Sequence, residues 1–415
     1  MNPISSLARR AKAIGKSLYY RADYWLEANR EYYLHKISGG NSKSRLNKHA
    51  ALNWTREEPS TSLDQDKLAL FVAYHPNKRA PESNINYAKA IAACGFRVIY
   101  IHNGPIDDQD TAPLKPFCER IVCRENIGQD FGGWKDAILE YADSKELDRT
   151  KWLLICNDSN FFLSSNQGQF VSCFSKALER DDVDLIALNK NQELWSHYQS
   201  YFLCFRKSLF LTPSFRDFWA QYKPISHRYH AINNGEIKLT RDIIKGAHSF
   251  VLYEPSRLYI ALREKRPSRR EFYSLTPKSS LYLAAQPLAG YDEDLPVSTL
   301  DLHRALSILE LHNPSHALAL LFNRYCYSPF LKKDVVKHGC YSMPQIAELL
   351  LLLGIPKDTP EWNEIIQNLI LLGSNNSYIR YRKQAYRQGI NPILGSRFRG
   401  YGNILTDTGI NDQTD

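Results

Sequence analysis

Leu68-Ala-Leu-Phe-Val-Ala-Tyr74 is the first long apolar run of the chain, and it indicates the fold class. The run reads as a buried strand that ends at His75-Pro76. A helical segment at Asn84–Cys94 follows and stops at Gly95, and Phe96–His102 is a second apolar strand. Strand, helix and strand at this spacing are typical of a doubly wound α/β domain, in which a parallel sheet is buried on both faces.

The same alternation continues outward from this run. We predict strands at Arg120–Cys123, Trp152–Cys156 and Asp184–Leu188, and a helix at Gly132–Ser144. The sequence therefore predicts a mixed, mostly parallel sheet within a domain of residues 66–300. Ligands of such sheets bind at the carboxyl ends of the strands, so polar residues at those ends are the candidates for function.

The two flanks of this domain differ from it in composition. Residues 1–65 are predicted to comprise a basic amphipathic helical arm and a linker, and the linker is the polar stretch at 38–66 with Gly, Ser and Pro. Residues 301–415 are predicted to be a helical region with a loose Gly- and Asn-rich tail from about residue 395. The helices expected there are Leu302–Leu311, Pro314–Tyr325, Met343–Leu353 and Trp362–Leu372.

Composition excludes several classes of protein. Of the 415 residues, 43% are hydrophobic and 23% are charged, which excludes a wholly disordered chain. No apolar run reaches the length of about 18 residues that a membrane-spanning helix needs, and we expect no secretory signal at the basic N-terminus. The eight cysteines form no Cys-x-x-Cys pair and mostly lie in apolar runs. We therefore expect reduced, buried thiols in a cytoplasmic protein.

Positive charge is concentrated at the N-terminus. The net charge is +9, and residues 1–50 hold ten Lys and Arg against three Asp and Glu. Apolar residues from Ile4 to Trp25 recur at spacings of three and four, with basic residues opposite. Such a helix can lie on the inner face of an anionic membrane or dock on the protein, and both readings stay open. A second basic, aromatic stretch at 378–387 has no nucleic-acid motif beside it, so no nucleic-acid partner is expected.

The densest polar cluster is Arg124-Glu-Asn-Ile-Gly-Gln-Asp-Phe-Gly-Gly-Trp-Lys-Asp136, between a strand and a helix. Glycines allow a close backbone approach, and a helix N-terminus attracts anions. Asp130 could cap the helix or hold a ribose, and Arg124 or Lys135 could face a diphosphate. The segment is neither a Walker A loop nor Gly-x-Gly-x-x-Gly, which disfavours an NTPase or a dehydrogenase.

Further polar residues follow the ends of predicted strands: Tyr74 and His75, Asn103, and Asn157-Asp158-Ser159. Asp158 could hold Mg²⁺ or Mn²⁺ on a diphosphate, or it could cap a turn. His197 could be a buried core histidine. Glu236 opens a predicted helix, where it could serve the helix dipole or act as a general base.

Five segments in this order carry a family resemblance: the cluster at 124–135, Asn-Asp-Ser at 157–159, His-Tyr-Gln-Ser-Tyr-Phe at 197–202, Asn-Pro-Ser-His at 313–316 and Pro-Phe-Leu-Lys-Lys at 329–333. Together they resemble the rhamnan synthesis protein F family, glycosyltransferases of bacterial cell-surface polysaccharide assembly. The resemblance runs from about residue 68 to 340. It implies a GT-A-like, Rossmann-type domain that binds a nucleotide-sugar at the strand ends.

The resemblance also implies roles for individual residues. Asp158 stands where GT-A enzymes have an Asp-x-Asp metal element, and the sequence Asn-Asp-Ser leaves metal dependence open. Glu236 would be the base, and His197, Gln199 and Ser200 would face the acceptor or the sugar. Ser315 and Ala319 depart from the family pattern, which has Thr and an aromatic residue there. The residues expected to line the donor are Tyr74, His75, Asn103, Arg124, Asn126, Gly128, Asp130, Lys135 and Asn157.

The expected activity is transfer of a sugar from a nucleoside diphosphate to a lipid-linked surface glycan, such as an O-antigen of lipopolysaccharide. dTDP-L-rhamnose is a candidate donor, inversion at the anomeric carbon is expected, and the protein would be peripheral on the cytoplasmic membrane. Two alternatives stay open. One is a non-catalytic assembly subunit that keeps the fold, and the other is a basic adaptor for membrane or nucleic acid.

Overall fold

The computed structural model describes residues 66–75, 79–192, 195–277 and 292–374, together with Ala22, Trp25, Leu26, Trp54, Thr55 and Ala285. Most of the predicted amphipathic arm, the basic stretch at 378–387 and the tail lie outside these residues. Within the described part of the chain, no helix combines the length and apolar character needed to span a bilayer.

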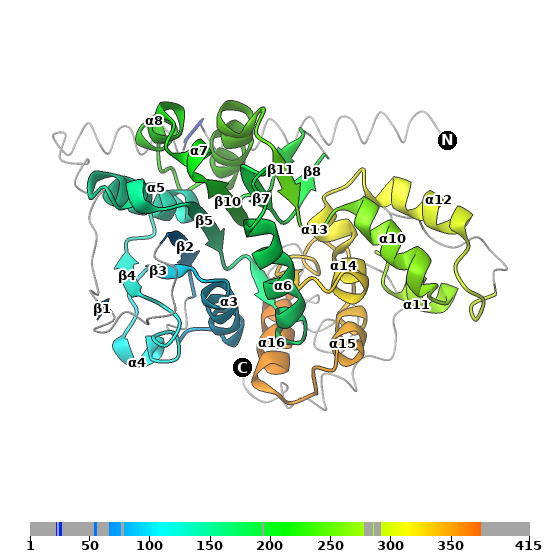
Figure 1. The fold of residues 1–415 in the computed structure, drawn as a ribbon. Coiled ribbons are helices and arrows are strands. Elements are labelled where there is room, and N and C mark those ends of the chain that lie inside the picture. Colours follow the sequence, from blue (N-terminus) through cyan, green and yellow to red (C-terminus); the bar gives the residue numbers. More distant parts are fainter. Residues whose placement is uncertain are drawn as a thin grey trace.

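An eight-stranded sheet in the order β1-β4-β3-β2-β5-β10-β7-β11 forms the centre of the fold (Figure 1). β2 pairs in parallel with β3 and β5, and β3 with β4, whereas β10 runs antiparallel between β5 and β7. The predicted mixed, mostly parallel α/β sheet is thus confirmed. The strands are β1 (Trp54–Thr55), β2 (Lys67–Ala73), β3 (Arg97–Asn103), β4 (Arg120–Arg124), β5 (Trp152–Asn157), β7 (Leu185–Ala187), β10 (Phe202–Arg206) and β11 (Ser249–Val251).

The apolar run of β2 is continuous because both faces of the sheet are covered. Alternate residues of a strand point to opposite faces. Leu68, Leu70 and Val72 belong to one buried cluster, and Ala69, Phe71 and Ala73 belong to the other. The first cluster holds the buried faces of α5 (Gln129–Asp143) and α8 (Pro213–Gln221).

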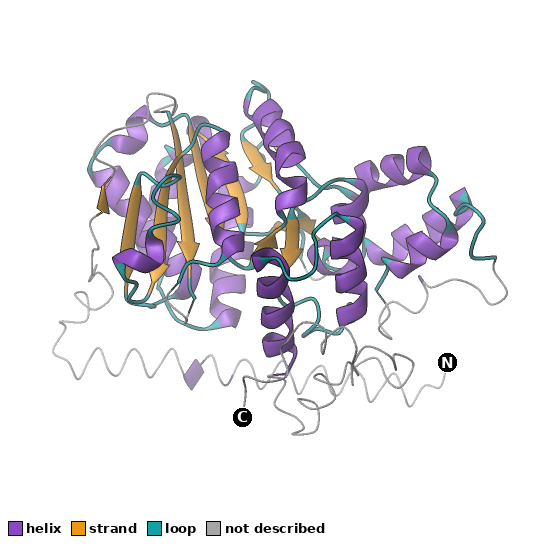
Figure 2. Cartoon of the chain, turned by 90° about the horizontal axis from the view of Figure 1, so that it is seen from below, coloured by secondary structure: helices purple, strands orange, loops and turns teal. Residues whose placement is uncertain are grey.

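The second cluster holds the buried faces of α3 (Glu82–Ala93) and α6 (Gln167–Leu178). Viewed from below in Figure 2, helices flank the sheet on both sides. The shorter elements are α4 (Asp108–Thr111), η1 (Glu146–Arg149), β6 (Asn160–Phe162), η2 (Ser164–Asn166), β8 (Lys190–Asn191), β9 (His197–Tyr198), α7 (Lys207–Phe210), α9 (Arg228–His230), the π-helices η3 (Ala231–Ile237) and η4 (Thr240–Ile244), α10 (Pro255–Lys265) and α11 (Arg269–Ser274).

The C-terminal helices share a core with the sheet. The second cluster extends along the chain from Ala69 to Ile370, and α16 packs on α3 and α15 (Figure 1). β12 pairs antiparallel with β6, directly after β5. Residues on both sides of the boundary predicted at residue 300 therefore pack into the same apolar cluster. The elements are α12 (Thr299–Leu309), α13 (Pro314–Ala317), α14 (Ala319–Tyr325), β12 (Phe330–Lys332), α15 (Met343–Leu352) and α16 (Pro360–Ser374).

Two sequence predictions need correction. The predicted linker contains β1, which pairs with β4 at the edge of the sheet and is too short to have a pattern of its own. The predicted helix Pro314–Tyr325 is two helices, because Leu318, with φ −113° and a fully buried side chain, belongs to neither.

Candidate active site

Polar side chains meet just beyond the carboxyl end of β5. Asn157, the last residue of β5, donates from Nδ2 to Oδ2 of Asp130 at 2.7 Å. Oδ1 of Asn157 accepts from the Ser159 hydroxyl at 2.6 Å. These bonds join the first turn of α5 to the turn after β5. Asp130, Asn157 and Asp158, predicted from separate motifs, are thus brought together.

Two lysines from the C-terminal region lie against this group. The pairing of β12 with β6 sets Lys332 opposite Asn160, and Lys332 Nζ donates to the Ser159 hydroxyl at 2.8 Å. Lys333 Nζ lies 3.5 Å from Asp158 Oδ2. The sequence assigned neither lysine a role. The available signal was the Lys-Lys pair that ends the segment 329–333.

Burial changes the charge states in this group. Burial, reinforced by the nearby Asp158 carboxylate, raises the pKa of Asp130 to about 7. Burial lowers the pKa of Lys332, and the carboxylates of Asp334, Glu236 and Asp130 oppose that shift. Three carboxylates therefore stabilise the positive charge of Lys332. Its ammonium also lies 4.5 Å from the centre of the Tyr201 ring.

Glu236, which acts electrostatically on Lys332, lies in the π-helix η3 rather than in the first turn of an α-helix. Its carboxylate contacts His197 Nε2 at 2.8 Å and accepts from the Ser200 hydroxyl at 2.6 Å. Burial alone would raise the pKa of Glu236, but the hydrogen bonds from His197 and Ser200 outweigh burial and hold the pKa below its usual range. Glu236 and the separately predicted segment that carries His197 and Ser200 therefore meet, with Glu236 ionised.

Two buried atoms near these groups have no hydrogen-bond partner among the described residues. One is Oε1 of Gln199, in the same turn as Ser200, and the other is Nδ1 of His75. Nε2 of His75 contacts the Tyr100 hydroxyl at 3.2 Å, and burial lowers the pKa of His75 to about 4. A buried polar atom without a partner is costly, so both atoms are candidates for contact with a ligand. Tyr74 is exposed, and its N–H donates to Asp158 at 3.4 Å.

Arg124, expected at the diphosphate, is occupied within the protein. Its guanidinium lies 2.9 Å from Asp136 and donates to Asn103 Oδ1 at 2.5 Å and to the Ile127 carbonyl at 2.9 Å. Its side chain is only 4% exposed. The cavity beside Arg124 and Asp136 has a volume of about 30 Å³, which holds about one water molecule. Arg124 and Asn103 thus join the ends of β3 and β4, and Arg124 also ties them to α5 through Asp136, so their geometry favours a structural role.

Lys135 and Gly128 also make internal contacts. Lys135 Nζ donates to the carbonyls of Ala220 and Tyr222 at 3.1 and 2.5 Å, which ties α5 to the end of α8. Gly128 has φ 74°, and a Cβ there would lie 2.4 Å from Pro224. Its N–H donates to Ser226, so the backbone before α5 is covered by protein. Asn126 is exposed.

The groups around Asp158 do not fit a divalent ion well. Asp158 already faces the ammonium of Lys333, and no other carboxylate joins it in a set of three ligands within the described residues. The one such set in the described chain is His316, Asp334 and His338. Mg²⁺ and Mn²⁺ prefer several oxygen ligands, so Asp158 with Lys333 beside it is a poor site for either ion.

A family model described as "Rhamnan synthesis protein F" matches residues 98–259. The chain is 26% identical over 332 residues to the uncharacterized protein y4gN of Sinorhizobium fredii (strain NBRC 101917 / NGR234), covering 75% of this chain and 82% of that protein.

Similar solved structures have low TM-scores. A glycosyltransferase involved in glycosylation of the PBCV-1 major capsid is 10% identical, with a TM-score of 0.28 over 46% of this chain and 82% of its own. The Pyrobaculum calidifontis mannosyltransferase PcManGT, in complex with GDP-Man and Mn²⁺, is 11% identical, with a TM-score of 0.25 over 87% and 97% of the two chains.

A third structure, 4-diphosphocytidyl-2C-methyl-D-erythritol synthase from Anaerococcus prevotii DSM 20548, is 10% identical, with a TM-score of 0.30 over 46% and 89%. Likeness at this level supports no argument about activity. The family model covers the motifs at 124–135, 157–159 and 197–202, and the motifs at 313–316 and 329–333 lie beyond it. Over residues 98–259, the resemblance to the rhamnan synthesis protein F family that the motifs predicted is confirmed.

Proposed function

We propose that this protein is a glycosyltransferase that uses a nucleoside-diphosphate sugar. The observation that carries the proposal is the approach of Lys332 and Lys333 to Ser159 and Asp158 at the carboxyl end of β5. Ligands of α/β sheets bind at this edge, and the family match points to glycan synthesis. Two ammonium groups at the strand ends suit the two phosphates of such a donor.

Lys332 and Lys333 stabilise the leaving diphosphate. The bond from the anomeric carbon to the diphosphate oxygen breaks, and its electron pair stays on the diphosphate, whose negative charge increases. Cations placed in advance next to this charge stabilise the transition state. The bond with Ser159 and the contact with Asp158 hold both ammonium groups in place before the donor binds.

Glu236 is the general base. The acceptor hydroxyl forms a bond to the anomeric carbon and loses its proton to the Glu236 carboxylate. The lowered pKa of Glu236 keeps this carboxylate ionised, and therefore able to accept the proton, throughout the neutral range. His197 and Ser200 orient it. One base and a single displacement give inversion at the anomeric carbon.

The name of the matched family supports the finer proposals. We place L-rhamnose, supplied as dTDP-L-rhamnose, first among the donors to test, and a lipid-linked glycan as the acceptor. The excess of positive charge in residues 1–50 supports a position on the cytoplasmic face of the membrane that holds such an acceptor.

The experiment compares wild type with Glu236→Gln. A thermal-shift panel of UDP, dTDP, GDP and CMP first identifies the nucleotide, and turnover of the matching nucleotide-sugars is then measured. Glu236→Gln should bind the nucleotide normally and lower kcat by about 10²–10⁴-fold. Glu264→Gln, which changes an exposed acid within α10, is the control and should leave both unchanged.

Near-normal turnover by Glu236→Gln would contradict the base assignment. Nucleotide binding by wild type without turnover of any nucleotide-sugar would favour the non-catalytic subunit instead. Absence of binding by all four nucleotides would contradict the proposed donor site itself.

A further inference from the structure

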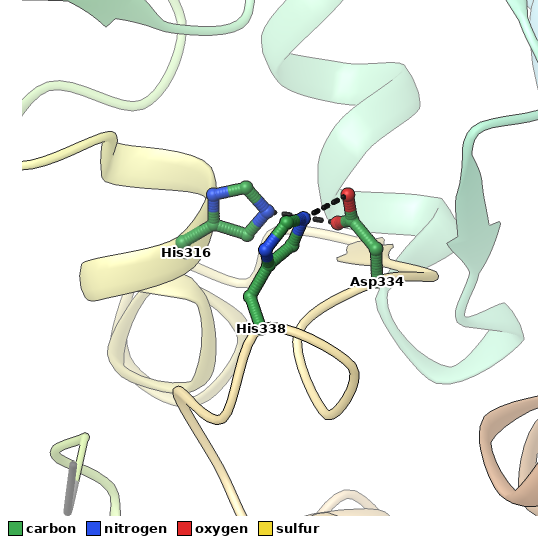
Figure 3. Close-up of side chains that lie close together, drawn as sticks. All are labelled: His316, Asp334 and His338. Atoms are coloured by element: carbon green, nitrogen blue, oxygen red, sulfur yellow. Dashed lines mark hydrogen bonds and ion pairs between the residues drawn. The ribbon is translucent and has the colours of Figure 1, made fainter. Parts of the chain in front are cut away.

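A compact group of potential metal ligands lies outside the proposed active site. His316 Nε2 lies 2.8 Å from Asp334 Oδ1, and His338 Nε2 lies 3.0 Å from Asp334 Oδ2. Figure 3 shows both imidazoles directing a ring nitrogen toward the same carboxylate. The three ligand atoms all lie within 4.8 Å of one another. One carboxylate thus receives two imidazoles, one on each oxygen.

Two anchored segments supply these ligands. His316 lies in the short helix α13, which Asn313 caps by accepting from Ser315 N–H at 3.0 Å. Asp334 and His338 lie in the turn after β12, where His338 N–H donates to the Asp334 carbonyl at 2.9 Å. The Tyr341 hydroxyl donates to the Ala317 carbonyl at 3.0 Å and so joins the two segments. The ligand group is therefore held in place by bonds that do not involve the ligand atoms.

We propose that His316, Asp334 and His338 bind a transition-metal ion, Zn²⁺ by preference. Zn²⁺ takes His nitrogen and Asp oxygen at about 2.0–2.2 Å in tetrahedral geometry, which places neighbouring ligand atoms about 3.3 Å apart. The two His–Asp distances need to lengthen by only a few tenths of an ångström to reach that value. Two imidazoles also favour Zn²⁺ over Mg²⁺, which prefers oxygen.

The surroundings permit entry of the ion. The His338 side chain is 41% exposed, whereas those of His316 and Asp334 are 14% and 19% exposed. The cations that face the group are Arg228, 3.7 Å from Asp334, and Lys332. Arg228 is 67% exposed, so its guanidinium can move toward solvent when an ion enters.

The ion would position the lysines of the proposed active site. Asp334 directly follows Lys333, so a metal on Asp334 fixes the segment that carries both ammonium groups to α13. This consequence rests on the proposed function, whereas binding of the metal does not. The two histidines and Asp334 are therefore positioning residues: they fix the lysine segment and do not themselves contact the donor.

The test is performed on the full chain without nucleotide. The protein is stripped with a chelator, loaded with Co²⁺ or Zn²⁺, and desalted, and bound metal is measured by elemental analysis and by the visible absorption of Co²⁺. Wild type should retain one equivalent. His338→Ala and His316→Ala should weaken binding by more than about 100-fold, which exceeds the usual cost of losing an outer-shell partner. His248→Ala removes an exposed histidine elsewhere and should keep the full equivalent.

Circular dichroism confirms folding of each variant, and the exposure of His338 makes His338→Ala informative even if His316→Ala fails to fold. Failure of wild type to retain the ion would show that the two histidines form only ion pairs with Asp334, and the proposal would be wrong. Equal retention by His338→Ala would overturn it as well. Lys333→Gln should still bind Zn²⁺, so loss of nucleotide binding in that variant separates the active-site proposal from this one.

Discussion

The segments 124–136 and 329–338 are both rich in charged side chains, yet their charges have different surroundings. Arg124 is enclosed by Asp136, Asn103 and a backbone carbonyl, and Lys135 donates to two backbone carbonyls. Lys332 and Lys333 instead reach toward Ser159 and Asp158 at the carboxyl end of β5. The first segment uses its positive charges to hold elements together. The lysines of the second segment also contact Ser159 and Asp158, and we propose that they lie beside the donor as well.

This difference shows why the density of polar residues in a motif does not locate a ligand. The glycines of the first segment serve packing, since a Cβ at Gly133 would lie 2.8 Å from Val72 of β2. A motif such as 124–136 can thus be specific to a family because it supports the strand ends around the site. The lysines that we propose to contact the donor come from β12 and the residue after it.

The largest effect is expected at Arg124. Arg124→Gln leaves the buried Asp136 without its cation, and removing one partner of a buried pair costs about 3–5 kcal/mol of the free energy of unfolding. Chemical denaturation measures this loss. Arg216→Gln is the control, because Arg216 and its partner Asp143 are 64% and 73% exposed, and its cost should stay below about 1 kcal/mol. If Arg124→Gln also lowered the free energy of unfolding by less than about 1 kcal/mol but abolished nucleotide binding, Arg124 would instead belong to the donor site.

The opposite result is expected for the lysines. Lys332→Gln and Lys333→Gln should each lower kcat/KM for the donor by about 10²–10³-fold, since each removes a charge beside the leaving diphosphate. The exposed Lys245 provides the control variant Lys245→Gln, which should turn over normally. Steady-state kinetics with the nucleotide-sugar identified by the thermal-shift panel measures the effect. Unchanged kcat/KM in both variants would show that the lysines of the second segment, like the charges of the first, do not act on the donor.

The smallest effect concerns Asp130, a residue of the first segment on which Lys332 and Lys333 of the second act electrostatically. Its pKa is raised from 3.8 to about 7, so the folded protein binds the proton more tightly than the unfolded chain. The associated stability is fully present below about pH 4 and is lost as the pH rises through about 7. Asp130→Asn avoids the buried charge, and because Asp130 keeps partial exposure, its melting temperature should exceed that of wild type by only a few degrees at pH 8.

At pH 4 the two proteins should melt together. Melting curves between pH 4 and 8 provide the measurement, and a constant difference across this range would show that Asp130 is ionised throughout.

The strands at the centre of the sheet could be predicted because they are buried on both faces. The runs at 68–74, 96–102 and 152–156 agree with β2, β3 and β5 within about one residue at each end. β12 could not be predicted, since its three residues become a strand only by pairing with β6, about 170 residues earlier in the chain. The assignment of Lys332 and Lys333 was missed for the same reason.

Within the site, Asp130, Asn157 and Asp158 could be predicted to meet, because the rule for strand ends places them at one edge. Glu236, His197 and Ser200 were also named as candidates from the sequence, and the structure adds that they contact one another. The enclosure of Arg124 depends on Asp136 and Asn103 folding back onto it, and no spacing in the sequence encodes that. His316, Asp334 and His338 come from two segments that no local pattern connects.

The central claim, that Lys332 and Lys333 hold the diphosphate of the donor, is tested most directly by comparing mono- and diphosphates of the same nucleoside. Calorimetric titration of wild type should show clearly tighter binding of the diphosphate. The double variant Lys332→Gln/Lys333→Gln should bind both nucleotides alike, with the monophosphate affinity retained. If the double variant kept the full preference for the diphosphate, the second phosphate would lie elsewhere, and the account of this site would be wrong.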